Sequence, residues 1–300
     1  MGCLRSCLDY LDIDISDGWL YGGTGHAFII NLTPDLCPSG PTAWKSEKLF
    51  KLGRNLGYSI DGVFGFKRQP DFHEVQRKAF EHVKKSIDAG HPCYGWELIV
   101  PDFYTVNGYD ETGYYYLDMD GPQRGPKPWK SLGDPGIGIV EMYSVQAGEQ
   151  ADDRVTVNGA LEFALKHAYT REYLMDDYQS GLEGYKTWIK GLDTKEATVG
   201  GVAYNAAVWA ECRRYAVDFL EEAAERLDRQ GLFEDAVESY RKISGELDTL
   251  KNLYPFKVPP DYETRIQDTE KAKTGVAHLT RAMEAERVGL KSLGKIIDEL

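Results

Sequence analysis

The 300-residue sequence lacks long hydrophobic segments. No apolar run approaches the roughly 20 residues that a membrane-spanning helix requires, and no segment has the basic, apolar and small-residue order of a secretory leader. Cysteine is also scarce, since five thiols are too few, and odd in number, to indicate a disulfide framework in a chain of this length. We therefore expect a cytoplasmic protein with reduced thiols and without a membrane partner.

Positive charge is in short supply. The chain has 35 Lys and Arg residues against 48 Asp and Glu residues, which gives a net charge of −13. A nucleic-acid partner requires clustered Lys and Arg that displace counterions, so we expect none. The hydrophobic fraction of 42% is sufficient for a full core, and the length fits one large domain or two ordinary ones.

Recognisable metal and phosphate motifs are missing. Zinc ligands would have to come from Cys3, Cys7, Cys37, Cys93 and His26. These residues contain no Cys-x-x-Cys pair and their spacing is irregular, so we predict no metal and no cofactor. The segment Gly22-Gly-Thr-Gly25 lacks the Lys-Ser/Thr of a phosphate-binding loop. We interpret it as a backbone turn that places Gly23 and Thr24 beside a ligand.

The first half of the chain predicts an α+β domain over residues 1–147. Apolar residues at helical spacing indicate helices, and β-branched and aromatic runs between turn residues indicate strands. The expected helices span 3–12, 46–57 and 71–89. The expected strands span 27–32, 92–100, 103–108, 113–117 and 137–145. A hairpin turn at 109–113 and a loop at 121–128 complete the pattern.

The second half predicts a helical bundle over residues 151–300. Apolar residues recur at alternating steps of four and three in 202–227, 232–254 and 272–300, which is typical of antiparallel helices packed side by side. Arg213 and Glu286 interrupt this spacing. An exposed heptad seam on these helices would permit a homodimer, and a helical interaction module is one alternative reading of the chain.

Two sets of short blocks carry a resemblance to a known family. Cys3 is followed by Leu8-x-x-Leu11, Ile15-Ser16, Leu20-Tyr-Gly22 and Gly25-x-Ala27-Phe28, and later by Asp88-Ala-Gly-x-Pro92 and Asn107-Gly-Tyr-Asp110. These blocks resemble the N-terminal domain of the butirosin-biosynthesis acyltransferase, which is related to C39-type, papain-like cysteine peptidases. The helical half is similar to the domain that often follows it. The resemblance implies a papain-like fold and cysteine-dependent acyl transfer or amide hydrolysis on a small molecule, with an acyl carrier as a possible donor.

The resemblance also implies roles for individual residues. Cys3 stands where the nucleophile is expected, ahead of a helix whose N-terminus would favour a thiolate. The strand position of the family's histidine holds Asp102, and no histidine occurs between His91 and His167. A thiol nucleophile needs a base, and His26 would have to serve if the glycine-rich turn brings it over Cys3.

The orienting residue of the catalytic set is the last role to fill. Asp118 or Asp120, on the following strand, is the candidate that the resemblance implies. The predicted catalytic set is therefore Cys3, His26, Asp102 and Asp118. Because this set lacks the strand histidine of the family, a second function stays open, in which the same scaffold binds a small molecule and performs no chemistry.

Candidate ligand-binding residues lie on the two central strands. Trp96, Glu97, Asp102 and Tyr104 fall close together there, and strand alternation puts Trp96 on one face with Leu98 and Glu97 on the other. Glu97 and Asp102 would hold a cationic group, such as the amine of an aminoglycoside-like or polyamine ligand. The alternative is that both carboxylates are solvated strand residues.

The amino-terminal residues allow another reading. The segment Met1 to Ser6 fits the N-myristoylation pattern, and Cys3 would then be a palmitoylation candidate. An acylated terminus needs a free tail, whereas Leu8 and Leu11 follow at helical spacing. We therefore expect folded structure from about residue 3 onward.

Overall fold

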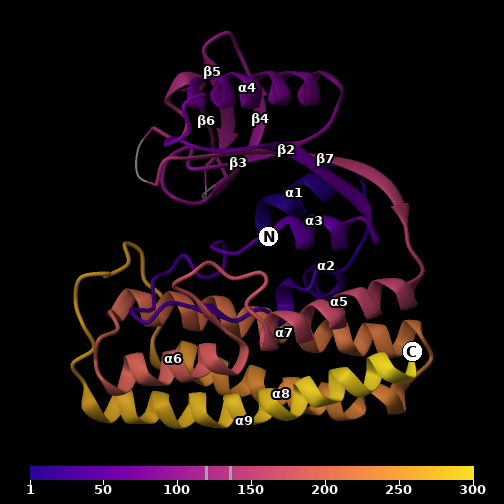
Figure 1. Ribbon diagram of the computed structural model, residues 1–300, viewed down its shortest axis with the longest axis vertical. Helices are drawn as coiled ribbons and strands as arrows, with labels where there is room; N and C mark the ends of the chain where they lie inside the picture. Colours follow the sequence, from indigo (N-terminus) through magenta and orange to yellow (C-terminus); the bar gives the residue numbers. More distant parts are fainter. Residues whose placement is uncertain (119–120, 135–136) are drawn as a thin grey trace. The chain divides into compact units, whose positions relative to one another are not determined.

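The computed structural model describes residues 1–118, 121–134 and 137–300. The chain divides into two compact units, each discontinuous in sequence (Figure 1). The sheet unit comprises Met1–Asp14 and Gly57–Gln150, and the helical unit comprises Ile15–Leu56 and Ala151–Leu300. The predicted boundary near residue 150 coincides with the end of the sheet unit. The segment Ile15–Leu56, which we expected in the first domain, groups with the helices instead.

The sheet unit is built on six strands in the order β2-β7-β3-β4-β5-β6. Four neighbouring pairs are antiparallel: β7 with β3, β3 with β4, β4 with β5, and β5 with β6. The strands are β2 (Leu56–Phe66), β3 (Cys93–Trp96), β4 (Phe103–Tyr109), β5 (Gly113–Leu117), β6 (Gln123–Pro128) and β7 (Ile139–Gln150). The short 3-10 helix η2 (Trp129–Ser131) lies between β6 and β7. The predicted α+β class is confirmed at this level.

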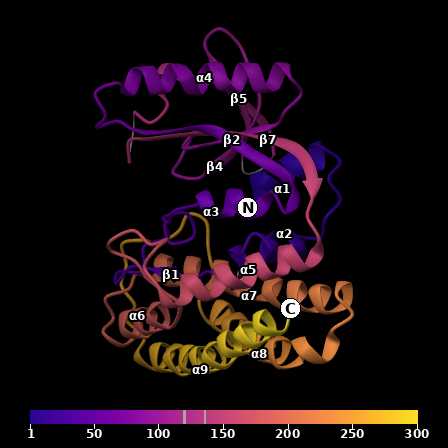
Figure 2. The ribbon, with the colours of Figure 1, turned by 45° about the vertical axis from the view of Figure 1, so that its right-hand side comes forward.

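Two helices cover opposite faces of this sheet. Helix α4 (Phe72–Asp88) packs on one face and α1 (Gly2–Tyr10) on the other, as both ribbon views show (Figures 1 and 2). The core beneath α4 contains Ala79, Val83, Val106 and Met142, all buried. Burial of these apolar side chains between helix and sheet is the main stabilising term of the unit.

The predicted helix over 71–89 and the hairpin between 103 and 117 are confirmed. The hairpin turn is fixed by the Asp110 carboxylate, which accepts hydrogen bonds from the backbone N–H groups of Thr112 at 2.7 Å and Gly113 at 3.0 Å. The loop predicted at 121–128 is wrong, because strand β6 occupies most of it. This strand is an exposed edge strand rich in glycine and proline, so it has no alternating apolar pattern.

The helical unit contains long helices at its carboxyl-terminal end. These are α7 (Val199–Arg226), α8 (Gln230–Leu253) and α9 (Thr269–Glu299). Helix α8 packs against both α7 and α9, as the apolar spacing predicts. The remaining elements are α2 (Asp17–Gly23), η1 (His26–Phe28), α3 (Glu47–Gly53), α5 (Asp153–Tyr169) and α6 (Gly181–Asp193), with β1 (Asn31–Leu32) paired to β8 (Gln179–Ser180). None of the helices in the described ranges combines the length and apolarity that crossing a bilayer demands.

The segment after α2 explains why residues 15–56 belong with the helices. Helix α2 packs directly on α7, and a Cβ atom at Gly22 would lie 2.0 Å from the Phe219 side chain. The strand predicted at 27–32 is reduced to Asn31–Leu32, because Arg213 of α7 donates hydrogen bonds to the carbonyl oxygens of Ala27 and Ile29. Those oxygens are therefore satisfied by a side chain and not by a neighbouring strand.

Candidate functional site

Cys3 lies in the first turn of α1, on the sheet face opposite α4. Its thiol is partly buried and lies near the Thr105 side chain of β4. Burial raises the pKa of the Cys3 thiol, and the nearby Asp102 carboxylate raises it further, whereas the positive charge of the amino terminus and the Thr105 side chain lower it in part. The net direction is upward, so the neutral thiol is favoured and the thiolate expected at a helix N-terminus is not.

Asp102 lies near enough to Cys3 for its charge to act on the thiol. Its carboxylate accepts the backbone N–H of Phe103 at 2.7 Å, and its carbonyl oxygen accepts the N–H of Glu97 at 2.8 Å. Burial raises the pKa of the Asp102 carboxyl. A carboxylate beside a thiol opposes ionisation of that thiol, so Asp102 does not replace an imidazole in function.

His26 belongs to the helical unit, where it has a different thiol partner. The Sγ atom of Cys212, on α7, lies 3.6 Å from His26 Nδ1. Burial lowers the pKa of His26 to about 3 and raises the pKa of Cys212 to about 12, so both groups are neutral near pH 7. The separation suits a thiol and its base. Cys212 is 1% exposed and His26 is 8% exposed, so the two groups contact each other inside the core of the helical unit.

Glu97 follows strand β3 in a strained conformation. Its backbone φ is +60°, in the left-handed region that side chains other than glycine rarely adopt. This reversal ends the strand that we expected to reach Val100. It also ends the expected alternation, because Leu98 packs in the core beneath α4, whereas Trp96 contacts Phe103 with ring centroids 5.0 Å apart.

One side-chain oxygen of Glu97 and the indole nitrogen of Trp96 are buried without a hydrogen-bond partner among the described residues. Glu97 is 2% exposed, and its Oε2 atom accepts no hydrogen bond from any residue that the structure describes. The Nε1–H of Trp96, a residue 8% exposed, is likewise unused within the described part of the chain. Burial raises the pKa of the Glu97 carboxyl, and the positive charge of Lys127 lowers it in part. Glu97 is therefore not the solvated strand residue of the alternative reading.

Tyr104 stabilises the loop that carries Glu97. It is 2% exposed, and its hydroxyl oxygen accepts the backbone N–H of Val100 at 3.3 Å. At the base of the same loop, the backbone N–H of Glu97 donates a hydrogen bond to the Asp102 carbonyl oxygen. Tyr104 thus holds the loop in place and is a positioning residue for Glu97.

The remaining predicted site residues are engaged elsewhere. Asp118 forms an ion pair with Arg124, at 3.1 Å, across the β5–β6 hairpin. Thr24 is fully buried and donates its hydroxyl to the Leu20 carbonyl, and a Cβ atom at Gly23 would lie 2.7 Å from Leu56. The glycine-rich turn is therefore accounted for by close packing in the helical unit. Asp120, the alternative orienting residue, lies outside the described residues.

Metal ligands do not gather in the residues for which coordinates are described, since no three His, Cys, Asp or Glu side chains there form a possible metal site. Cys7 and Cys93 are both buried in the sheet unit, with Cys7 Sγ at 4.0 Å from the Cys93 carbonyl oxygen. Burial raises the pKa of Cys93 to about 12. Both thiols therefore behave as small apolar core groups.

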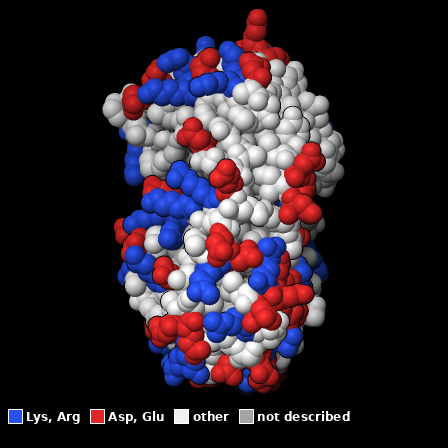
Figure 3. All heavy atoms as spheres, turned by 90° about the vertical axis from the view of Figure 1, so that its right-hand side faces the viewer, with Lys and Arg blue, Asp and Glu red and all other residues white. Residues whose placement is uncertain are grey.

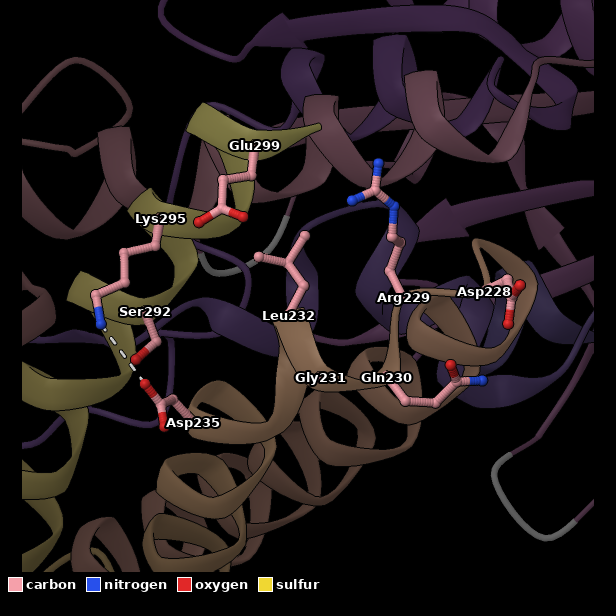
Figure 4. A pocket seen from close by; sticks show the side chains of 9 residues that line it. All are labelled: Asp228, Arg229, Gln230, Gly231, Leu232, Asp235, Ser292, Lys295 and Glu299. Carbon is pink, nitrogen blue, oxygen red and sulfur yellow. Dashed lines mark ion pairs between the residues drawn. The ribbon is translucent and has the colours of Figure 1, made fainter.

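A pocket of about 530 Å³ lies in the helical unit, between the start of α8 and the end of α9 (Figure 4). It is lined by both signs of charge, and Lys295 pairs with Asp235 at 3.5 Å across it. On the face drawn in Figure 3, acidic and basic side chains of this unit lie beside one another. Ser292, the buried polar residue among its lining residues, donates its hydroxyl to the Val288 carbonyl at 3.3 Å, and the charges around it are mixed in sign, so we assign the pocket no ligand.

Comparison with known proteins gives no assignment. The sequence matches no protein-family model and no curated protein. The candidate site therefore stands on the geometry of Trp96, Glu97, Asp102, Tyr104 and Cys3.

Proposed function

We propose that the sheet unit binds a small, hydroxylated amine at Glu97 and Trp96, on a papain-like scaffold that performs no covalent chemistry. The observation that carries this proposal is the buried carboxylate of Glu97, with one oxygen left without a partner among the described residues. A buried carboxylate oxygen without a hydrogen-bond partner is costly, so proteins rarely retain one without a use.

The two unpartnered atoms define the ligand chemistry. The Glu97 carboxylate accepts hydrogen bonds and favours a cation, whereas the Trp96 indole N–H only donates. An ammonium group would satisfy Glu97, and a hydroxyl oxygen would satisfy Trp96. Aminoglycoside-like molecules carry both groups, whereas a polyamine carries only the first. The Trp96 ring can also stabilise a cation over its face.

The strain at Glu97 supports a binding role. A left-handed backbone at a residue with a full side chain costs on the order of 1–3 kcal/mol, and it persists only where the surroundings enforce it. The Asp102 carbonyl and the Tyr104 hydroxyl provide those constraints. The loop therefore holds the carboxylate in one position before any ligand arrives, which reduces the entropy lost on binding.

Cys3 supports a second candidate function, acyl transfer. The thiol, the Thr105 hydroxyl and Asp102 lie together at the start of α1, where the resemblance requires a nucleophile. Against this candidate, the pKa of Cys3 is raised, and no histidine in the described part of the sheet unit hydrogen-bonds it. His73 contacts Gln76 and stacks on Trp129 instead. A neutral thiol without a base is a poor nucleophile.

Thermal-shift measurements test the ligand class. The probes are kanamycin, which has amines and hydroxyls, spermidine, which has amines only, and methyl glucoside, which has hydroxyls only. We expect stabilisation to decrease in that order, since a ligand stabilises according to its affinity for the folded state. Trp96→Phe should remove the preference for kanamycin over spermidine. Equal shifts from all three probes, or none, would contradict the proposal.

A further inference from the structure

A second candidate site lies in the helical unit, where the connection between α8 and α9 passes the start of α7. A pocket of about 190 Å³ opens there. Its lining residues are Val199, Gly200, Ala203, Tyr254, Pro255, Phe256, Lys257, Pro259, Pro260, Asp261 and Lys271. The walls are mostly apolar, and the three prolines contribute no N–H groups, so few hydrogen-bond donors face the pocket.

Tyr254 and Lys271 supply the unused donors. Tyr254 is 3% exposed, and its hydroxyl has no hydrogen-bond partner among the residues that the structure describes. The Lys271 ammonium lies 4.5 Å above the centre of the Tyr254 ring. Within the described ranges Lys271 forms no ion pair, whereas Lys273 on the same helix pairs with Glu270 at 2.9 Å.

The Asp261 carboxylate and the first N–H groups of α7 are already satisfied, whereas the lining residue Lys257 adds a second ammonium group. The Asp261 carboxylate accepts the backbone N–H groups of Glu263 and Thr264, at 3.2 and 2.9 Å. The first N–H groups of α7 are also used: that of Val199 donates to the Thr264 carbonyl, and that of Gly200 donates to the Asp261 carbonyl. The pocket is therefore not an anion site at a helix terminus. Its chemistry rests on Tyr254 and Lys271.

The close approach of the connecting segment to α7 fixes the pocket wall. A Cβ atom at Gly200 would lie 2.6 Å from the Asp261 carbonyl oxygen, so only glycine allows the two chains to approach this closely. Tyr204 and Phe256 contact each other, with ring centroids 5.6 Å apart, and this contact holds Phe256 beside the opening. The apolar wall is thus supported from two sides.

We propose that this pocket binds a small carboxylate with a short apolar body. The carboxylate would receive hydrogen bonds from the Tyr254 hydroxyl and the Lys271 ammonium, while the apolar body packs against Phe256 and the prolines. Two donors without an acceptor select an anion. The volume suits a single ring or a short chain.

Calorimetric titration of the full chain with phenylacetate tests this site. Phenylacetamide, which has the same shape without the charge, is the matched probe. We expect phenylacetate to bind with a Kd on the order of 1 mM and phenylacetamide at least about ten-fold more weakly. No heat with phenylacetate at tens of mM, or equal binding of both probes, would overturn the proposal.

Three variants locate the binding. Tyr254→Phe removes only the hydroxyl and Lys271→Met removes only the charge, and each should weaken phenylacetate by at least about five-fold. Lys273→Met, on the exposed face of the same helix, should leave the affinity unchanged. Tyr254→Phe should also keep the Tm of the parent, because the Tyr254 hydroxyl has no hydrogen bond with the described residues of the folded protein that the substitution could remove. Phenylacetate binding that survives both Tyr254→Phe and Lys271→Met would place the ligand elsewhere and overturn the assignment.

Discussion

Arg213 and Glu286 form a bidentate ion pair in the core of the helical unit. Arg213 Nε lies 2.9 Å from Glu286 Oε2, Nη2 lies 3.0 Å from Oε1, and both side chains are buried. The Tyr185 hydroxyl donates to the same carboxylate at 3.1 Å. Through Arg213 Nη1, which reaches the Ala27 and Ile29 carbonyls, the pair joins α7 and α9 to the segment that follows α2.

Breaking this pair should destabilise the protein strongly. Glu286→Ala leaves the Arg213 guanidinium buried without a counter-charge, and we expect a loss of about 3–5 kcal/mol in the free energy of unfolding. The double variant Arg213→Met with Glu286→Leu should recover only part of that loss, because the Ala27 and Ile29 carbonyls lose their donor. Urea denaturation followed by circular dichroism measures both. Glu284→Ala, which removes an exposed pair with Arg287, is the control and should cost less than about 1 kcal/mol. A Glu286→Ala variant as stable as this control would show that the pair does not hold the core.

The reactivity of Cys3 distinguishes binding from catalysis. Because burial raises the pKa of its thiol, iodoacetamide at about pH 6 should label Cys3 no faster than Cys37, the other partly exposed cysteine. Peptide mass spectrometry after timed labelling gives the two rates. Selective labelling of Cys3 at this pH would instead support the acyl-transfer candidate and count against a purely binding role.

Asp102→His tests whether the scaffold is papain-like. If Asp102 occupies the position of the family's histidine, the new imidazole should lie beside the Cys3 thiol and replace a charge that opposes its ionisation. We expect labelling of Cys3 at about pH 6 to rise by at least about ten-fold. Glu111→His, on an exposed turn of the same unit, should have no effect. If both variants label at the parental rate, the proposed relationship between the two positions is wrong.

Stability should depend on pH through Glu97. Its pKa in the folded protein is raised above the ordinary value of 4.5 by burial, so the protonated form is favoured by folding. The contribution of Glu97 is fully present below the unfolded-state pKa and is lost as the pH rises through the folded-state pKa. The stability of the parent relative to Glu97→Gln should therefore fall across that interval, whereas Glu111→Gln should show no such difference. Thermal unfolding across an acidic pH series checks the slope, and a constant difference between the two proteins would contradict it.

The long helices could be predicted because their apolar spacing is local information. Arg213 and Glu286 stand in the sequence only as interruptions of that spacing. Their pairing could not be foreseen, since it depends on how α7 packs against α9. The packing of α7 on η1 gives His26 its partner Cys212, which is far away in the sequence and carries no motif. A polar residue within an apolar helical stripe is nevertheless a signal, because a buried charge requires a partner.

The closeness of the candidate residues could be predicted from the sequence, whereas their geometry could not. Trp96, Glu97, Asp102 and Tyr104 stand out as a cluster of aromatic and acidic residues on neighbouring strands. The reversal of the backbone at Glu97 could not be foreseen, because nothing in Glu97-Leu-Ile-Val100 indicates a turn. Strand β2 was missed for a related reason: its glycines and exposed polar residues hide the strand pattern.

Calorimetric titration of kanamycin into the parent, Glu97→Gln and Glu111→Gln proteins at about pH 7.5 tests the central claim most directly. Glu97→Gln keeps the shape of the side chain and removes the charge, so the account predicts a Kd at least about ten-fold higher for this variant. The Glu111→Gln protein should bind as the parent does. A Glu97→Gln protein that binds kanamycin as tightly as the parent, or a parent that does not bind it, would contradict the account.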